Sequence, residues 1–196
     1  MKIAPNHIYH VFNRGNNKQL LFFNNENYLY FLRKIRTHLA PVCDILAYCL
    51  MPNHFHFLIH MNEESAKIAV RKSGGIEVNK FSNGLRTVLS SYTRGVNIEQ
   101  ERTGTLFSQN TKVKPTFGGT FNGDYAVWCF RYIHQNPVKA RLVNFPDKWP
   151  FSSYIDYVGK RNGTLCNQHL AADLLDFELN EFYEFARVGV PEGFEV

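Results

Sequence analysis

The chain has 196 residues, 44% of them hydrophobic and 15% aromatic, which is enough for one sizeable core in a single domain with an appendage. Its formal net charge of +5 and pI near 9.0 favour a polyanionic partner such as nucleic acid. No leader-like segment opens the chain, no apolar run approaches the roughly 18 residues of a membrane span, and the cysteines lack a CxxC spacing. We therefore expect a reduced, cytoplasmic protein without structural zinc or a membrane partner.

Hydrophobic periodicity and turn residues predict alternating strands and helices in the first two thirds of the chain. In chain order these are a strand over 8–13, a helix over about 25–39 capped by Asn24 or Asn25, strands over 43–51 and 54–61 around Pro52-Asn53, a helix over about 78–94, and a strand from Thr105 toward Lys114. The order βαββαβ predicts an α+β fold, with a ferredoxin-like antiparallel sheet and helices on one face. Residues 63–79 exceed what a minimal version of this fold needs and are interpreted as an insertion.

A further helix is predicted over about 124–135. It should end at Asn136-Pro137, because the residue before a proline resists helical geometry. Two short helices are expected in the tail, near 168–175 and 178–187. We divide the chain into a domain over 1–143 and a C-terminal extension over 144–196, packed on or near that domain.

The predicted strand over 54–61 begins with two histidines one residue apart. Successive side chains of a strand alternate faces, so His54 and His56 stand on one face, roughly 7 Å apart along the chain, while Phe55 and Phe57 point the other way. Both rings can lean onto one cation. An isolated pair of this kind is more often a half-buried polar pair than a metal site, so the motif needs its context.

The helix over 124–135 brings a phenol and an amide to one face. With about 100° of rotation per residue, Tyr132 and Asn136 lie one turn apart on the same side, while His134 points nearly opposite. If this helix crosses the histidine-bearing face of the sheet, Asn136 completes a three-ligand metal site and the Tyr132 hydroxyl lies beside it. Tyr125, on a similar face, is the alternative tyrosine.

Five segments resemble, in the right order, the signatures of a known family. They are Tyr9-His10-Val11 with Asn13-Arg14-Gly15, Met51 to His56, Thr103 to Phe107, Tyr132 to Val143, and Pro150 to Tyr154. His54-Phe55-His56 is similar to the HUH motif of single-tyrosine transposases, the Y1 group of bacterial insertion sequences, and especially of their REP-associated tyrosine transposase relatives. The matches span roughly the first four-fifths of the chain, and their order makes chance agreement a poor explanation.

This resemblance implies a role for each site residue. His54 and His56 are metal ligands, Tyr132 is the nucleophile and Asn136 is the third ligand. Some relatives use glutamine as the third ligand, which makes Gln135 a rival, but the four-residue spacing from the tyrosine favours Asn136.

The resemblance also implies a reaction. Single-stranded DNA is cleaved and rejoined, near hairpins or palindromic repeats, through a covalent bond between Tyr132 and the DNA 5′ phosphate. An unperturbed tyrosine has a pKa of about 10, so attack at neutral pH needs help from a divalent ion at the phosphate. The family implies Mg²⁺ or Mn²⁺, whereas ligand chemistry alone leaves zinc equally open. A monomer is favoured, with a homodimer as the alternative.

Basic residues along the chain are candidates for phosphate contacts, which would make DNA binding strongly dependent on salt. They are Arg14, Lys18, Arg71, Lys72, Lys112, Lys114, Lys139 and Arg141.

Two other functions fit the same residues. A non-catalytic nucleic-acid-binding module on a ferredoxin-like fold predicts that Tyr132→Phe leaves function intact. A metal phosphoesterase that activates water predicts turnover without a covalent link between protein and DNA.

Overall fold

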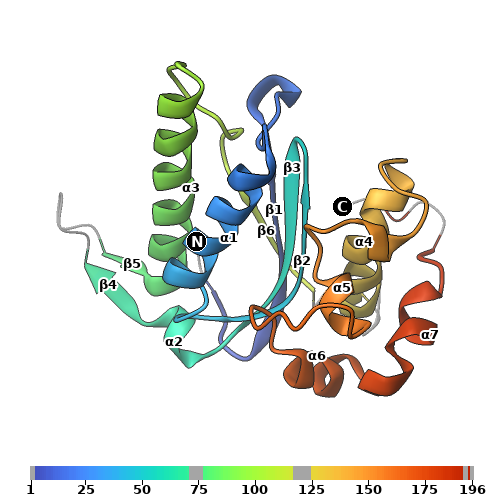
Figure 1. The fold of residues 1–196 in the computed structure, drawn as a ribbon. Helices are drawn as coiled ribbons and strands as arrows, with labels where there is room; N and C mark the ends of the chain where they lie inside the picture. The colour runs from blue at the N-terminus through green and yellow to red at the C-terminus, as the bar shows by residue number, and fades with distance from the viewer. Residues whose placement is uncertain (1–2, 71–76, 117–124, 192–193, 195–196) are drawn as a thin grey trace.

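The computed structural model describes residues 3–70, 77–116, 125–191 and 194. A four-stranded antiparallel sheet forms the central layer (Figure 1). Helices α1 (Asn25–His38) and α3 (Lys80–Glu99) cover one face, and α4 (Tyr125–Lys139) lies on the other with the C-terminal helices. In the described part of the chain, no helix has the length and apolar character needed to cross a bilayer.

The predicted ferredoxin-like sheet is confirmed. Its strands are β1 (His7–Arg14), β2 (Asp44–Met51), β3 (His54–Met61) and β6 (Lys112–Pro115), in the order β2-β3-β1-β6. Every neighbouring pair is antiparallel. In the pairing of β1 with β3, Phe12 lies opposite His56 and Arg14 opposite His54. The residues of the histidine motif therefore lie in the middle of the sheet and not at an edge.

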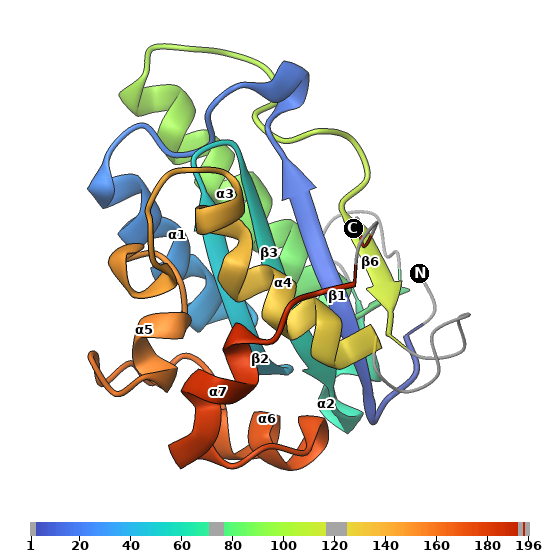
Figure 2. The same cartoon turned by 90° about the vertical axis from the view of Figure 1, so that its right-hand side faces the viewer.

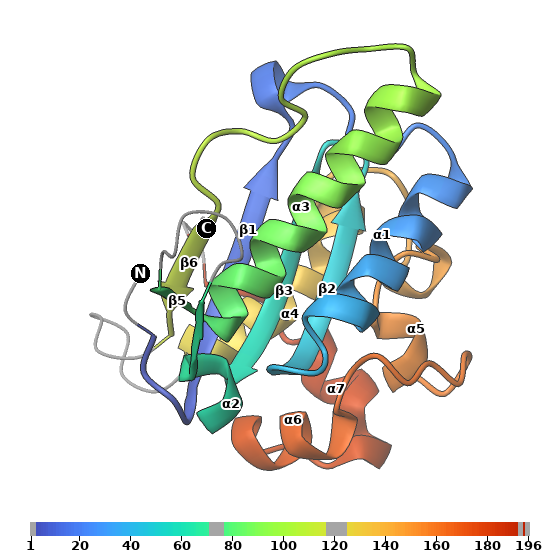
Figure 3. The ribbon, with the colours of Figure 1, turned by 90° about the vertical axis from the view of Figure 1, so that its left-hand side faces the viewer.

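Helices α1 and α3 lie side by side over one face of the sheet (Figure 3), and aromatic side chains pack them against it. Phe31 of α1 packs against Phe55 and Phe57 of β3 and against Tyr92 of α3. Asn24 caps α1, as predicted, by accepting a hydrogen bond from the Asn27 amide at 3.0 Å. The odd-numbered face of β3 is thus committed to packing, which leaves the even-numbered face for the histidines.

Two predicted elements differ from the observed ones. Helix α3 extends to Glu99 and not to Arg94, because the buried stripe continues to Val96 and Tyr30 packs over Gly95. The predicted strand from Thr105 is shorter, since β6 begins only at Lys112 and Phe107 forms an isolated bridge with Gly15. Leu106 and Phe107 are both buried, which breaks the alternation that a regular strand needs.

The interpreted insertion contains elements of its own. After β3 come α2 (Glu63–Ala66) and a two-stranded ribbon of β4 (Ile68–Val70) and β5 (Glu77–Asn79). Residues 71–76, which include the predicted DNA contacts Arg71 and Lys72, lie outside the described residues.

Helix α4 runs through Pro137 to Lys139, so the predicted end at Asn136-Pro137 is wrong. Proline removes one backbone donor, but the helix continues because the Ala140 amide donates to the Asn136 carbonyl and the Leu142 amide to the Pro137 carbonyl, both at 2.9 Å. Asn136 and Pro137 are buried. Asn136 therefore keeps helical geometry and stays in line with Tyr132.

The C-terminal segment packs against α4 and against β2 (Figure 2). It contains η2 (Pro146–Lys148), α5 (Tyr154–Tyr157), α6 (Gln168–Leu175), η3 (Leu179–Glu181) and α7 (Phe182–Arg187). A further 3-10 helix, η1 (Asn16–Lys18), lies between β1 and α1. The helix predicted near 168–175 is confirmed, and the one near 178–187 is found as η3 followed by α7.

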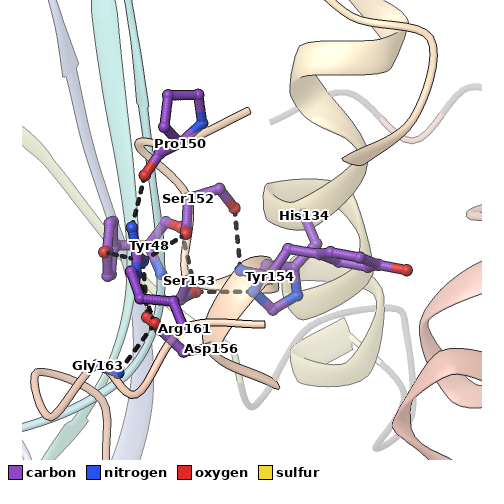
Figure 4. A network of polar contacts seen from close by, with 9 residues as sticks. All are labelled: Tyr48, His134, Pro150, Ser152, Ser153, Tyr154, Asp156, Arg161 and Gly163. Carbon is purple, nitrogen blue, oxygen red and sulfur yellow. Dashed lines mark hydrogen bonds and ion pairs between the residues drawn. The ribbon is translucent and has the colours of Figure 1, made fainter. Parts of the chain in front are cut away.

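A polar network joins this segment to β2 and α4 (Figure 4). The Ser153 hydroxyl accepts the Tyr48 amide at 2.9 Å and contacts Nε2 of His134 at 2.8 Å. Arg161 forms a two-pronged ion pair with Asp156, at 2.6 and 2.8 Å. Ser153 thus links α4 to β2 through hydrogen-bonding contacts on both sides.

Candidate functional site

The two histidines of β3 stand side by side on the face toward α4, as predicted. Their ring centroids are 5.0 Å apart, with the ring planes nearly perpendicular at 86°. His56 is buried, whereas His54 is half-buried at the start of the strand. The Nδ1 atom of His54 lies 2.7 Å from the Asn53 side-chain oxygen, which orients this ring.

Helix α4 crosses this face diagonally, over β2, β3 and β1 (Figure 2). The Tyr132 ring centroid lies 5.5 Å from that of His56. One turn later, Asn136 is buried and interacts with the His54 side chain. The crossing that the sequence left open is therefore present within one chain.

The alternative residues on α4 point elsewhere. Tyr125 packs against Phe194, at 5.3 Å between ring centroids, and against Cys129. Tyr132 also contacts Phe194, at 5.9 Å, but its ring lies 5.5 Å from that of His56. Gln135 donates from Nε2 to the carbonyls of Ala186 and Val188, at 2.9 and 3.2 Å. Tyr132 and Asn136 are thus the pair on α4 that meets the histidines.

Burial favours the neutral form of both histidines. Burial lowers the pKa of His54, and a side-chain hydrogen bond with Asn136 offsets part of that shift. Burial, with repulsion from His10 and His54, lowers the pKa of His56 well below 6.5. A neutral imidazole has a lone pair available, which is the form that binds a cation.

The donor set fits a divalent metal ion with open coordination positions. In the described part of the chain, no three His, Cys, Asp or Glu side chains gather to hold a metal. Asn136 offers an amide oxygen beside His54. Its Nδ2 atom is buried and has no hydrogen-bond partner among the described residues, so this amide has unused hydrogen-bonding capacity at the site.

A groove of about 630 Å³ opens in front of these side chains. Its lining includes three basic residues and no carboxylate: Phe12, Asn13, Arg14, Lys18, Asn53, His54, His56, Ser108, Gln109, Asn110, Lys112 and Tyr132. The predicted phosphate contacts Arg14, Lys18 and Lys112 thus lie at the site. We call this surface the site groove.

The other basic candidates differ in position. The Lys139 ammonium lies 5.1 Å from the centroid of the Tyr132 ring, and the Lys114 ammonium lies 5.4 Å from that of Phe12. Arg141 is exposed beyond the end of α4 and does not line the site groove. Positive charge is therefore concentrated beside Tyr132.

His10, to which the sequence alone gives no role, lies at the site. Its Nε2 atom lies 2.9 Å from Nδ1 of His56, and its side chain is fully buried. The contact depends on the register between β1 and β3, which the sequence alone does not show. The sequence indicates only that His10 and Phe12 lie on the same face of one strand.

Paired histidines on a ferredoxin-like sheet, facing a tyrosine and an asparagine on a crossing helix, define a candidate centre for phosphoryl transfer. No protein-family model and no curated protein matches the chain. Among solved structures, a REP-associated tyrosine transposase bound to a REP hairpin is similar, with a TM-score of 0.57 and 18% sequence identity over 80% of this chain and 82% of that one. The chain therefore has the fold of that transposase.

Proposed function

We propose that the protein is a REP-associated type of single-tyrosine HUH transposase, an enzyme that cleaves and rejoins single-stranded DNA through a covalent 5′-phosphotyrosine. The observation that supports this proposal most strongly is the meeting of Tyr132 with His56, at 5.5 Å between ring centroids, across two elements far apart in the sequence. A structural tyrosine needs no neutral histidine pair and no buried amide beside it. The fold shared with a transposase supports the same conclusion.

In this proposal each side chain has one task. His54, His56 and Asn136 hold a Mg²⁺ or Mn²⁺ ion, which supplies positive charge and Lewis acidity to the scissile phosphate when bound. The Tyr132 oxygen attacks phosphorus in line with the leaving 3′ oxygen. The bond from tyrosine oxygen to phosphorus forms, the bond from phosphorus to the 3′ oxygen breaks, the phenol loses its proton and the 3′ oxygen gains one.

Lys139 and the site groove favour this step electrostatically. The Lys139 ammonium lies 5.1 Å from the centroid of the Tyr132 ring, so its positive charge favours negative charge that develops on the phenol. Arg14, Lys18 and Lys112 offer charge-assisted hydrogen bonds to phosphates of the bound strand. The reverse attack by a 3′ hydroxyl on the phosphotyrosine reseals DNA without external energy, because the phosphodiester energy is retained.

The substrate and the working unit follow from the same arrangement. We take the substrate to be single-stranded DNA next to a hairpin or palindromic repeat, since the similar transposase was solved on a REP hairpin. His54, His56, Tyr132 and Asn136 come from one chain, so a monomer carries a complete site. We assign catalysis to residues 1–143 and a supporting role to residues 144–196. We expect the protein to act in the cytoplasm, where it can reach DNA.

A covalent-adduct assay tests the proposal. Purified protein is incubated with labelled single-stranded DNA that contains flanking genomic palindromes, with Mn²⁺ or Mg²⁺ or with EDTA, and SDS-resistant adducts are counted on a gel. Wild type should form the adduct only with metal, Tyr132→Phe should form none, and His54→Ala or His56→Ala should lose most of it. Tyr125→Phe is the matched control and should behave as wild type.

The same assay separates the other two functions. Cleavage without any adduct indicates a phosphoesterase that activates water, and DNA binding without cleavage indicates a non-catalytic module. Either result contradicts the transposase proposal.

A further inference from the structure

We propose that His10 is a positioning residue, which holds the proton of His56 on Nδ1 and so leaves Nε2 of His56 as the electron-pair donor toward a divalent cation. This inference rests on the proposed function, because it concerns the same site. It assigns a task to a buried histidine that lies outside the ligand set of His54, His56 and Asn136.

The two rings are held against each other by their strands and by Phe12. His10 and His56 are diagonal neighbours on adjacent strands, since His56 lies opposite Phe12 and His10 opposite Leu58. Their rings stack at 5.1 Å between centroids with an interplanar angle of 16°. Phe12 stacks on both, at 4.7 Å from His10 and 5.7 Å from His56. The contact at 2.9 Å between Nε2 of His10 and Nδ1 of His56 is therefore fixed by packing.

An imidazole that binds a cation is neutral, and a contact of 2.9 Å between two ring nitrogens needs one hydrogen between them. If His10 donates from Nε2, His56 has its proton on Nε2 and that atom is blocked for a cation. If His56 donates from Nδ1, its Nε2 lone pair is free. Only the second arrangement suits a metal ligand.

The surroundings of His10 allow the tautomer that this role requires. Its Nδ1 atom is buried and has no hydrogen-bond partner among the described residues, so no neighbour there fixes the proton on the other nitrogen. With its own proton on Nδ1, His10 accepts through Nε2 from Nδ1 of His56 and holds the proton of His56 there. The Nδ1 donor of His10 that stays unpaired is the cost of this arrangement.

Nitrogen NMR on wild type tests the tautomer directly. Protein labelled with ¹⁵N in its histidines is titrated with Zn²⁺, a diamagnetic ion that binds imidazole nitrogen. In the Zn²⁺ complex, Nδ1 of both His10 and His56 should show the shift of a protonated nitrogen. A deprotonated Nδ1 on His56 in that complex overturns the proposal.

Mn²⁺ affinity in variants tests the consequence, with electron paramagnetic resonance as the readout. His10→Leu should weaken Mn²⁺ binding by about 10- to 100-fold, the usual effect of losing such a supporting group. His10→Gln, whose amide oxygen can still accept from His56, should recover most of the affinity. His60→Leu, on the strand that carries His56, is the control and should bind Mn²⁺ as wild type does. Unchanged affinity in a folded His10→Leu protein overturns the proposal.

The outcomes separate this inference from the proposed function. If His10 controls Mn²⁺ affinity but wild type forms no DNA adduct, the positioning role stands and the transposase proposal fails. If wild type forms the adduct and His10→Leu binds Mn²⁺ normally, only the positioning role fails. Should His10→Leu not fold, the NMR result on wild type decides.

A second groove runs along α3. We infer that it binds the part of the single-stranded DNA that continues past the site groove. This α3 groove has a volume of about 870 Å³ between α3 and residues 102–113. Its lining holds three arginines and no acidic side chain: Ser82, Leu85, Arg86, Leu89, Ser90, Thr93, Arg94, Asn97, Ile98, Arg102, Gly104, Thr105, Leu106, Phe107, Thr111 and Val113.

The charges of the α3 groove are available to a ligand. Among the described residues, neither Arg86 nor Arg94 nor Arg102 forms an ion pair. Arg102 is held by Gln19 at 2.9 Å through Nη2, while its Nη1 is buried without a partner among the described residues. Glu99 turns away toward α1, where it accepts from Asn27 at 2.6 Å.

The α3 groove and the site groove lie on the two sides of the segment 106–113, so a strand passes from one to the other around this segment. Leu106, Phe107, Thr111 and Val113 line the α3 groove, whereas Ser108, Gln109, Asn110 and Lys112 line the site groove. Arginine heads beside an apolar floor suit a polymer with anionic links and flat bases, because guanidinium groups pair with phosphate and stack on rings. Single-stranded DNA held at the site groove has this chemistry.

Oligonucleotides of increasing length test the α3 groove. Arg86→Gln with Arg94→Gln should remove the gain in affinity that wild type shows when the single-stranded flank is lengthened, and should lower the salt slope for long strands by about 1.4. Adduct formation on a short strand should stay unchanged. Arg33→Gln with Arg36→Gln on α1 is the charge-matched control. A double variant with the wild-type length dependence, or a loss equal to that of the control, overturns the inference.

Discussion

Asn136 is the residue on which the proposed metal site depends most, because two histidines alone would hold a divalent ion weakly. Its side chain is buried beside His54, and the helix continues through Pro137, which keeps it one turn from Tyr132. The proline at the next position is therefore compatible with a ligand role and does not mark a helix stop.

Replacing Asn136 should therefore weaken metal binding. We expect Asn136→Leu to lower Mn²⁺ affinity at least about tenfold, as measured by calorimetry, because an oxygen ligand is lost. Asn136→Asp should keep the affinity, since a carboxylate oxygen takes the same place. Gln135→Leu is the matched control, because the Gln135 amide faces the carbonyls of Ala186 and Val188. A loss in Gln135→Leu with none in Asn136→Leu would exchange their roles.

At the scale of elements, α4 is positioned by the C-terminal segment as well as by the sheet. Arg161 donates to Asp156, to the Tyr48 hydroxyl at 2.9 Å and to the Pro150 carbonyl at 2.6 Å (Figure 4). Gly163 allows this arrangement, since a Cβ there would lie 2.4 Å from Oδ1 of Asp156. Ser153 links β2 to α4 through the Tyr48 amide and Nε2 of His134, whereas Arg161 joins the C-terminal segment to the Tyr48 side chain.

Removing Arg161 should loosen this support. We expect Arg161→Met to lower the free energy of unfolding by about 2 kcal/mol in urea titrations, because the buried Asp156 carboxylate loses its partner. Lys160→Met, next in the chain, breaks an ion pair with Asp147 whose lysine is exposed, and should cost below about 1 kcal/mol. Equal effects in the two variants would show that the Arg161 network contributes no more than a surface pair.

The sequence predicts the elements better than it predicts their contacts. The strand with its histidines, the Asn24 cap and the α4 face of Tyr132 follow from local spacing, and all three are confirmed. The partnership of His10 with His56 depends on strand register, and the Arg161 network depends on contacts over a hundred positions apart. Local rules also misplaced the end of α4, since tertiary packing outweighs one missing hydrogen bond at Pro137.

For the whole molecule, buried neutral histidines make stability depend on pH. Burial lowers the pKa of His134 to about 3, whereas an unfolded chain keeps a value near 6.5. Between these values the unfolded state binds a proton that the folded state does not, so this stability is complete above about pH 6.5 and is lost as the pH falls toward 3.

His134→Gln should therefore flatten the pH dependence of stability. In urea titrations between pH 6.5 and 4, we expect the variant to lose about 1.4 kcal/mol less per pH unit than wild type. His169→Gln in the exposed part of α6 is the control. Parallel curves for wild type and His134→Gln would contradict the assignment of a buried neutral His134.

Charge in the site groove should set the salt dependence of DNA binding. Arg14→Gln with Lys18→Gln removes two candidate phosphate contacts and should lower the slope of log affinity against log salt by about 1.4 for single strands. Arg141→Gln, outside the site groove, should change the slope less. If Arg141→Gln alone lowers the slope as much as the double variant, the strand follows another path.

The most direct measurement is the identity of the residue that becomes joined to DNA. Adduct formed with Mn²⁺ is digested with trypsin and nuclease, and the nucleotide-bearing peptide is sequenced by mass spectrometry. The proposed mechanism predicts a nucleotide phosphate on Tyr132, the tyrosine whose ring lies 5.5 Å from His56. A modification on Tyr125 or on any other residue, with Tyr132 unmodified, would contradict it.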